Sequence, residues 1–109
     1  LDPRLAAAHN GRGLLHAEAG EDAAAVAAFT RAVEVDASNA TYWSNLGNAR
    51  RATNDAAGAV DAYDRALALD PTHADAANGR GVMLVQGGRA ADAIDLFTRA
   101  LAGAPDFHD

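Results

Sequence analysis

The sequence predicts an all-α protein, an α-solenoid built from three helix-turn-helix units. Two features of composition support this: the chain has 30 alanines among 109 residues, and β-branched and aromatic residues are sparse. Alanine is the best helix former, whereas strands favour the residue types that are scarce here. The third observation is internal repetition with a period of 34 residues. A fixed period of this length is typical of stacked helical units.

The period is carried by a motif in which Ala, an aromatic residue and Ala occur at fixed spacing. The aromatic residue is Phe29, Tyr63 and then Phe97, each flanked by alanines four residues before and three residues after. Gly13, Gly47 and Gly81 recur at the same interval. The resulting units are 6–39, 40–73 and 74–107, with short tails at 1–5 and 108–109.

Each unit divides into two helical stretches separated by a turn. In the first unit the turn is at Gly20, and Asp36-Ala37-Ser38-Asn39 ends the unit. In the second, stretches 41–53 and 56–69 have one-sided apolar patterns and are divided by Asn54-Asp55, with Pro71 as the stop. In the third, Gly88 and Pro105 take the same places. Gly and Asn suit the left-handed backbone that ends a helix.

These residues resemble the tetratricopeptide repeat, whose pattern is Trp-x₂-Leu-Gly-x₂-Tyr, then Ala-x₃-Phe, then Pro. The second unit matches at Trp43, Leu46, Gly47, Ala59, Tyr63 and Pro71, with Arg50 in place of the first Tyr. The variable places hold His9, Arg12 and His16 in the first unit, and Ala77, Arg80 and Leu84 in the third. The resemblance implies a right-handed superhelix of six antiparallel helices, in which the first helix of each pair lines a concave groove.

The resemblance also implies which residues face the groove and what they do. We expect the groove to bind a peptide or helical segment of a partner protein. Gly11 and Gly79 would leave recesses there. The alternative is that asparagine is merely tolerated on a hydrated face. The expected partner-binding residues are Asn10, Leu14, Ser44, Asn45, Asn48, Arg51, Asn78 and Val82.

Some members of the family clamp the C-terminal carboxylate of a chaperone with Lys, Asn and Arg. Transferring that clamp to this sequence fails at four places, and only Asn45 agrees. An acidic peptide end would also meet Asp75. We therefore expect no binding of that kind. The residues at the four disagreeing places are Asn10, Leu14, Asp75 and Gly79.

Composition argues against several other functions. The net charge is −6, with nine arginines and no lysine, so neither nucleic acid nor an anionic membrane is an expected partner. No apolar run approaches the roughly 18–20 residues needed for membrane insertion. There is no cysteine, and His9 and His16 are seven residues apart, too far to share one metal ion. No catalytic motif is present, so we expect neither an enzyme nor a cofactor.

The ends of the chain suggest the main alternative function. Leu1-Asp2-Pro3 matches Leu69-Asp70-Pro71, so residues 1–5 are expected to be the tail of an upstream repeat in a longer protein. Uncapped ends accept another unit, which predicts head-to-tail self-association as a structural scaffold. Leu96, Phe97 and Leu101 would then lie partly bare.

Two further expectations follow from the sequence. Arg12 and Arg80 occupy places where leucine is usual, and each is expected to pair with an acidic group of the preceding unit. The Lys-free, Ala-rich and Arg-rich composition suggests a bacterial source. It leaves the compartment undetermined, with a cytoplasmic location favoured slightly.

Overall fold

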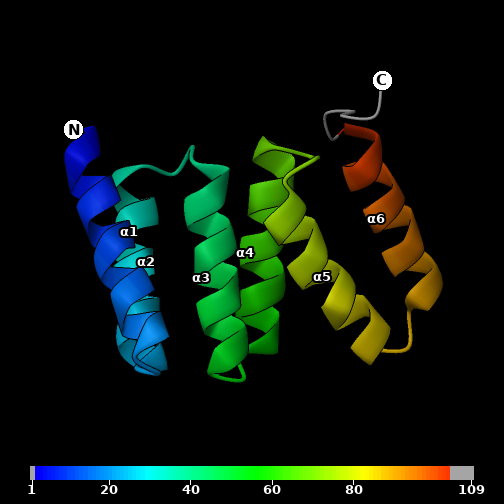
Figure 1. Ribbon diagram of the computed structural model, residues 1–109, viewed down its shortest axis with the longest axis horizontal. Coiled ribbons are helices and arrows are strands. Elements are labelled where there is room, and N and C mark those ends of the chain that lie inside the picture. The colour runs from blue at the N-terminus through cyan, green and yellow to red at the C-terminus, as the bar shows by residue number, and fades with distance from the viewer. Residues whose placement is uncertain (1, 104–109) are drawn as a thin grey trace.

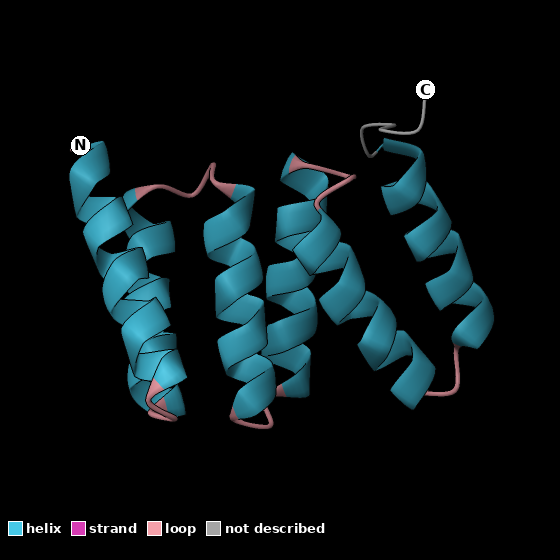
Figure 2. Cartoon of the chain, viewed as in Figure 1, coloured by secondary structure: helices cyan, strands magenta, loops and turns pink. Residues whose placement is uncertain are grey.

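The computed structural model describes residues 2–103, which form six helices and no strand. The helices pair into three hairpins that stand side by side in chain order (Figure 1, Figure 2). This confirms the predicted all-α solenoid. Leu1, the predicted stop at Pro105 and the tail 108–109 lie outside the described residues. The helices are α1 (Pro3–Glu18), α2 (Asp22–Val35), α3 (Ala40–Ala52), α4 (Ala56–Leu69), α5 (Ala74–Gln86) and α6 (Ala90–Gly103).

Short polar side chains fix where several helices begin. Asp2, Asn39, Asp55 and His73 each accept a hydrogen bond from a backbone N–H two or three residues later in the chain. Such a bond satisfies one of the four N–H groups that the first helical turn leaves without a partner. The His73 ring has a second bond, because its Nε2 lies 3.1 Å from the Thr41 hydroxyl at the start of α3. This ring therefore connects the second hairpin to the third.

The turns inside the three hairpins share one backbone geometry. Gly20, Asn54 and Gly88 have φ values of 78°, 65° and 79°, in the left-handed region. Glycine adopts this region freely and asparagine tolerates it better than most residues. The three turns predicted from the sequence are confirmed.

The helices form two layers with different spacing. In the inner layer the Cα atoms of α3 come within 8 Å of those of both α1 and α5, whereas no Cα atoms of α2, α4 and α6 come that close to one another over their described residues. The layer whose helices approach most closely is the shorter side of a curved stack. The first helices of the three hairpins therefore line the concave face.

The core runs continuously through the stack because large side chains bridge neighbouring clusters. Trp43 packs against the cluster around Phe29 and Leu46 and also against the cluster around Tyr63. Its indole Nε1 donates to the Ala37 carbonyl at 2.8 Å, which ties it to the preceding turn. A single helix pair cannot bury its own apolar face, so these bridging contacts hold the units together.

Candidate functional site

The concave face carries asparagine side chains that are already held in place. The Nδ2 of Asn45 on α3 donates to the Oδ1 of Asn10 on α1 at 2.9 Å, across the boundary between the first two repeats. Both side chains are half-buried. Within residues 2–103 the Asn45 Oδ1 makes no further hydrogen bond. The bond to Asn10 fixes the orientation of the Asn45 amide and leaves its Oδ1 without a partner in this part of the chain.

Tyr63 reaches the same face from the outer layer. It belongs to α4, and its fully buried ring passes between Gly47 on α3 and Gly79 on α5. A Cβ at Gly47 would lie 2.7 Å from the ring, and one at Gly79 would lie 2.6 Å from the Cε1 atom. Atoms that are not bonded do not approach this closely, so the path of the ring requires glycine on both sides.

The Tyr63 hydroxyl fixes a second asparagine. It donates to the Oδ1 of Asn48 at 2.5 Å, and the Arg51 guanidinium carbon lies 6.0 Å from the centre of the Tyr63 ring. Burial raises the pKa of the Tyr63 phenol, and the positive charge of Arg51 opposes part of that shift. The phenol therefore remains a donor at neutral pH. The Asn48 Nδ2 makes no hydrogen bond with another described residue, so it presents a donor to the groove.

The predicted partner-binding residues differ in accessibility. Leu14 is 49% exposed, Asn48 and Asn78 are exposed, and Arg51 and Val82 are half-buried. Exposure alone does not show that these residues bind a partner, so the partner-binding set stays a prediction. Asp75 lies exposed on α5, so the face carries charge of both signs.

Ser44 and Gly79 differ from the prediction. Ser44 is only 1% exposed, and its hydroxyl has no hydrogen-bond partner among the described residues. It is equivalent to Asn10 and Asn78, but α3 is flanked on both sides, and the short serine side chain does not reach past its neighbours. The predicted recess at Gly79 is wrong because the Tyr63 ring fills it. At Gly11 an added Cβ would meet no atom within 4 Å, so that recess is open.

The repeat pattern predicts Tyr63 only as one of three equivalent packing aromatics, whereas in the structure its hydroxyl also holds Asn48. The available signal was the hydroxyl, since Phe29 and Phe97 occupy the same place in the other units. A buried tyrosine hydroxyl needs a hydrogen-bond partner, which implies a polar group on the opposite helix.

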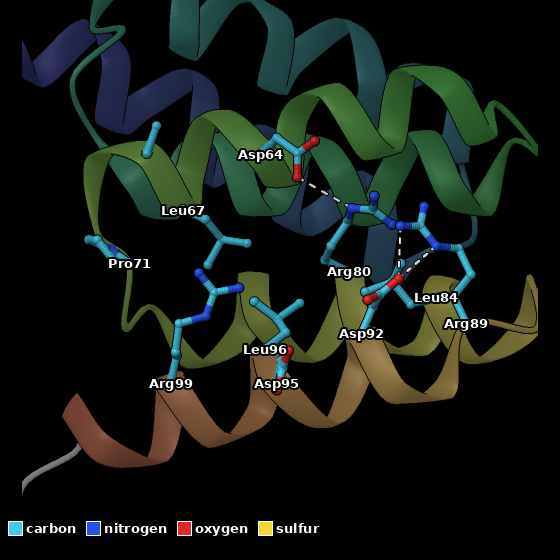
Figure 3. Close-up of a pocket in the computed structure, with 11 residues that line it drawn as sticks. Asp64, Leu67, Pro71, Arg80, Leu84, Arg89, Asp92, Asp95, Leu96 and Arg99 are labelled. Carbon is cyan, nitrogen blue, oxygen red and sulfur yellow. Dashed lines mark hydrogen bonds and ion pairs between the residues drawn. The ribbon is translucent and has the colours of Figure 1, made fainter.

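A second hollow lies away from the groove, at the junction of the second and third repeats. This junction pocket has a volume of about 450 Å³ and is lined by residues of α4, α5 and α6, including Asp64, Leu67, Arg80 and Arg99 (Figure 3). The Arg80 Nε donates to the Asp64 Oδ1 at 3.3 Å, which confirms that Arg80 pairs with an acidic group of the preceding unit. Arg12, the equivalent residue of the first repeat, forms no ion pair with any described residue. Asp2 binds Arg4 at 3.0 Å, and the place equivalent to Asp64 precedes residue 1, so the pairing of Arg12 stays a prediction.

The end of the array is only partly bare. Leu96 is buried at 8% exposure against Ala77, Leu84 and Ala93, so its predicted exposure is wrong. Leu101 is 75% exposed, as predicted. Self-association through this end stays a prediction.

Among residues 2–103, no three acidic or histidine side chains converge closely enough to hold a metal ion. Of the helices described, none combines the length and apolar character needed to cross a bilayer.

The sequence profile described as tetratricopeptide repeat matches residues 1–40 and 44–106. The chain belongs to the tetratricopeptide repeat family. No curated protein matches the sequence significantly. The family assignment agrees with the three hairpins and with the concave inner layer of first helices.

Solved tetratricopeptide repeat domains have the same fold. The first such domain of Spaghetti (RPAP3), bound to the HSP90 peptide SRMEEVD, has a TM-score of 0.88 and 20% identity, over 99% of this chain and 88% of that one. The second domain of Spaghetti, bound to the same peptide, has a TM-score of 0.84 and 23% identity, over 92% and 93%. MamA has a TM-score of 0.83 and 24% identity over 94% of this chain, which spans 60% of the MamA chain. At these identities the likeness shows the fold.

Proposed function

We propose that this protein is an interaction module whose concave groove binds an extended segment of a partner protein through the main chain of that segment. The proposal assigns the chain a binding role and no catalytic one. The family is a protein-interaction fold, and two similar structures hold a peptide. The observation that carries the proposal is the hydrogen bonding of Asn45 and Asn48, which orders both side chains and leaves polar atoms of each for a ligand.

Each of these asparagines uses one amide atom internally and leaves the other for a ligand. Asn45 uses one N–H of its Nδ2 for Asn10 and keeps its Oδ1 acceptor, while Asn48 uses one lone pair of its Oδ1 for Tyr63 and keeps both N–H groups of its Nδ2. Residues three apart on a helix are neighbours, with Cβ atoms about 5–6 Å from each other. An extended chain offers N–H and C=O groups in alternation, so this pair matches a peptide backbone irrespective of its sequence.

Preorganisation favours binding at these two positions. Ordering a free side chain on binding costs about 0.5–1.5 kcal/mol. Asn45 and Asn48 are already ordered by their internal hydrogen bonds, so much of that cost is met on folding. Leu14 on one side and Val82 on the other supply apolar contacts for side chains of the bound segment.

Selection of peptides from an unbiased phage-displayed library on the immobilised chain tests the proposal. We expect the selected peptides to share little sequence and to lose affinity at least tenfold with Asn45→Ala/Asn48→Ala, since two hydrogen bonds contribute about 1–3 kcal/mol. Thr98→Ala, on the outer helix α6, is the matched control and should leave affinity unchanged. Equal affinity of the double variant and the parent for every selected peptide would refute groove binding.

The peptide SRMEEVD serves as a second control. Its acidic residues would face the exposed Asp75, and Asn10 and Asn78 offer its carboxylates no cation, which leaves the half-buried Arg51 as the cation of the predicted groove set. We expect no measurable binding of this peptide by isothermal titration calorimetry. Binding as tight as that of the selected peptides would show that the groove recognises charge rather than main chain.

A further inference from the structure

The junction pocket lies at the place that a tryptophan ring fills one repeat earlier. Trp43 lies between the first two repeats, and the residue 34 positions later is Ala77, which has no ring. Five residues around Trp43, in its core cluster or in direct polar or cation–π contact with its indole, are Val33, Ala37, Leu46, Ala62 and Arg65. Their counterparts in the next repeat all line the junction pocket: Leu67, Pro71, Arg80, Leu96 and Arg99. The second junction therefore keeps the surroundings of the ring without the ring itself.

Larger apolar side chains fill only the inner part of this place. Leu67 and Leu96 stand where the junction of the first two repeats has Val33 and Ala62. They pack with Ala77 in one cluster, in which Ala77 is 1% exposed. The outer part stays open as the pocket of about 450 Å³, a size within the range of about 300–1,000 Å³ that is typical of ligand sites.

The hydrogen-bond acceptor of the ring also has a counterpart in the pocket. The Trp43 Nε1 donates to the Ala37 carbonyl, and Ala37 corresponds to Pro71. In both turns an aspartate Oδ1 accepts from the N–H two residues later, at 3.0 Å from Ser38 and at 3.1 Å from Thr72. That N–H belongs to the same trans peptide unit as the carbonyl of Ala37 or Pro71, so it fixes the direction of the carbonyl in both turns. No backbone N–H bonds to the Pro71 carbonyl in the described part of the chain.

The cation that stacks on the ring has a counterpart as well. The Arg65 guanidinium carbon lies 4.9 Å from the centre of the Trp43 ring, within the roughly 6 Å of a cation–π contact. Arg99 corresponds to Arg65, and Figure 3 shows it extending from α6 toward Leu67 of α4. Among the described residues, no aromatic ring forms a cation–π contact with Arg99. The pocket thus combines an apolar floor, an acceptor and a cation.

From this we infer that the junction pocket binds the indole ring of a tryptophan supplied by a partner protein. The ring lies on Leu67 and Leu96, and its N–H donates to the Pro71 carbonyl while Arg99 stacks on its face. Ion pairs at the rim surround this apolar floor, as in protein interfaces, whose central anchors are enriched in tryptophan. A second copy of this chain cannot supply the ring, because Trp43 is its single tryptophan and is held between its own repeats. The pocket lies away from the concave groove, so the inference is independent of the function proposed for that groove.

A peptide of sequence Ala-Ala-Trp-Ala-Ala with blocked ends, titrated into the full isotope-labelled chain, is the probe. The NMR signals of the Leu67 and Leu96 methyl groups and of the Arg99 side chain should move, because an indole ring shifts the signals of nuclei above and below it. The same peptide with a methyl group on the indole nitrogen cannot donate the N–H and should bind about three- to tenfold more weakly. Arg99→Ala should weaken binding of the parent peptide by at least about threefold, since it removes the stacked cation. N-acetyltryptophanamide should bind more weakly than the peptide, because it lacks the flanking main chain.

Two matched variants complete the test. Arg65→Ala removes the equivalent arginine, whose ring is already in place, and should not change binding. Ala77→Trp/Leu96→Ala gives the third repeat the residue pair of the second, and it should fold by circular dichroism yet no longer bind the peptide. If this variant does not fold, the affinity of Arg99→Ala decides. Unmoved pocket signals, parent-like affinity of Arg99→Ala or of the methylated peptide, or a folded double variant that still binds would overturn the inference. Shifts centred on the concave groove, or equal affinity of N-acetyltryptophanamide and the peptide, would do so too, because the peptide would then occupy the groove or the pocket would be a small-molecule site.

Discussion

Replacing Gly79 by alanine should destabilise the protein even though alanine is the better helix former. Gly79 lies inside α5 against the buried Tyr63 ring, and an added Cβ would lie 2.6 Å from both the Cε1 atom and the hydroxyl oxygen. The ring also packs closely on Gly47, where an added Cβ would lie 2.7 Å from it, so it has little space to move away from Gly79. Overpacking of this kind costs typically about 1–3 kcal/mol.

Gly11 is the matched control, since it is the equivalent residue of the first repeat, inside α1. Nothing lies within 4 Å of a Cβ placed there. Both substitutions gain the same helix propensity, about 1 kcal/mol. We expect Gly11→Ala to raise the free energy of unfolding by about that amount. The free energy of unfolding of Gly79→Ala should be lower than that of Gly11→Ala by about 1–3 kcal/mol, and this difference measures the clash with Tyr63 alone.

Urea denaturation followed by circular dichroism measures both free energies of unfolding. The two variants should also differ at the groove, because a displaced Tyr63 ring weakens the hydrogen bond to Asn48. NMR signals of the Asn48 side chain should move in Gly79→Ala and stay in place in Gly11→Ala. If Gly79→Ala is as stable as Gly11→Ala, the Tyr63 ring does not pass between Gly47 and Gly79. The account of how Tyr63 reaches and holds Asn48 is then wrong.

Three further predictions concern the polar contacts. Tyr63→Phe removes the hydroxyl that holds Asn48 and should cost about 1 kcal/mol in urea unfolding. The pKa of Tyr63 is raised above the ordinary 10.0, so the stability that its neutral hydroxyl contributes is complete below pH 10 and is lost as the pH rises further. The Tyr63→Phe variant should not show this loss of stability at alkaline pH. An identical dependence of the unfolding free energy on pH in both proteins would contradict this. His73→Ala removes the cap of α5 and should cost about 1 kcal/mol, whereas His73→Asn, which also accepts from the Ala76 N–H, should recover most of it in the same measurement.

Much of the fold could be predicted because its determinants recur at a fixed interval. The positive φ values at Gly20, Asn54 and Gly88 follow from residue types at equivalent places. The ion pair of Arg80 also followed from its place in the repeat, although its partner is Asp64 instead of Asp70. Asp64 lies on the neighbouring helix α4, so whether it reaches Arg80 depends on how α4 and α5 are rotated against each other. The spacing of residues in the sequence does not encode that rotation.

The groove was predictable only in outline. Equivalent positions are expected to behave alike, yet Ser44 is buried while Asn78 is exposed. The reason is that α3 has another first helix on each side, whereas α1 and α5 each have one on a single side only. Gly11 and Gly79 are likewise the same residue at the same place, one open and one filled by an aromatic ring. The local sequence around Gly11 and Gly79 is the same, Asn-Gly-Arg-Gly, so at these two positions only the surroundings differ.

The sequence by itself determined the repeat length, the helices and their turns, since these depend on contacts within one unit and the units are alike. The tertiary structure alone decided which asparagine atoms are free, how Tyr63 reaches Asn48, and which carboxylate pairs with Arg80. Those properties depend on the distances between side chains of different units, and such distances are fixed only when the hairpins pack together.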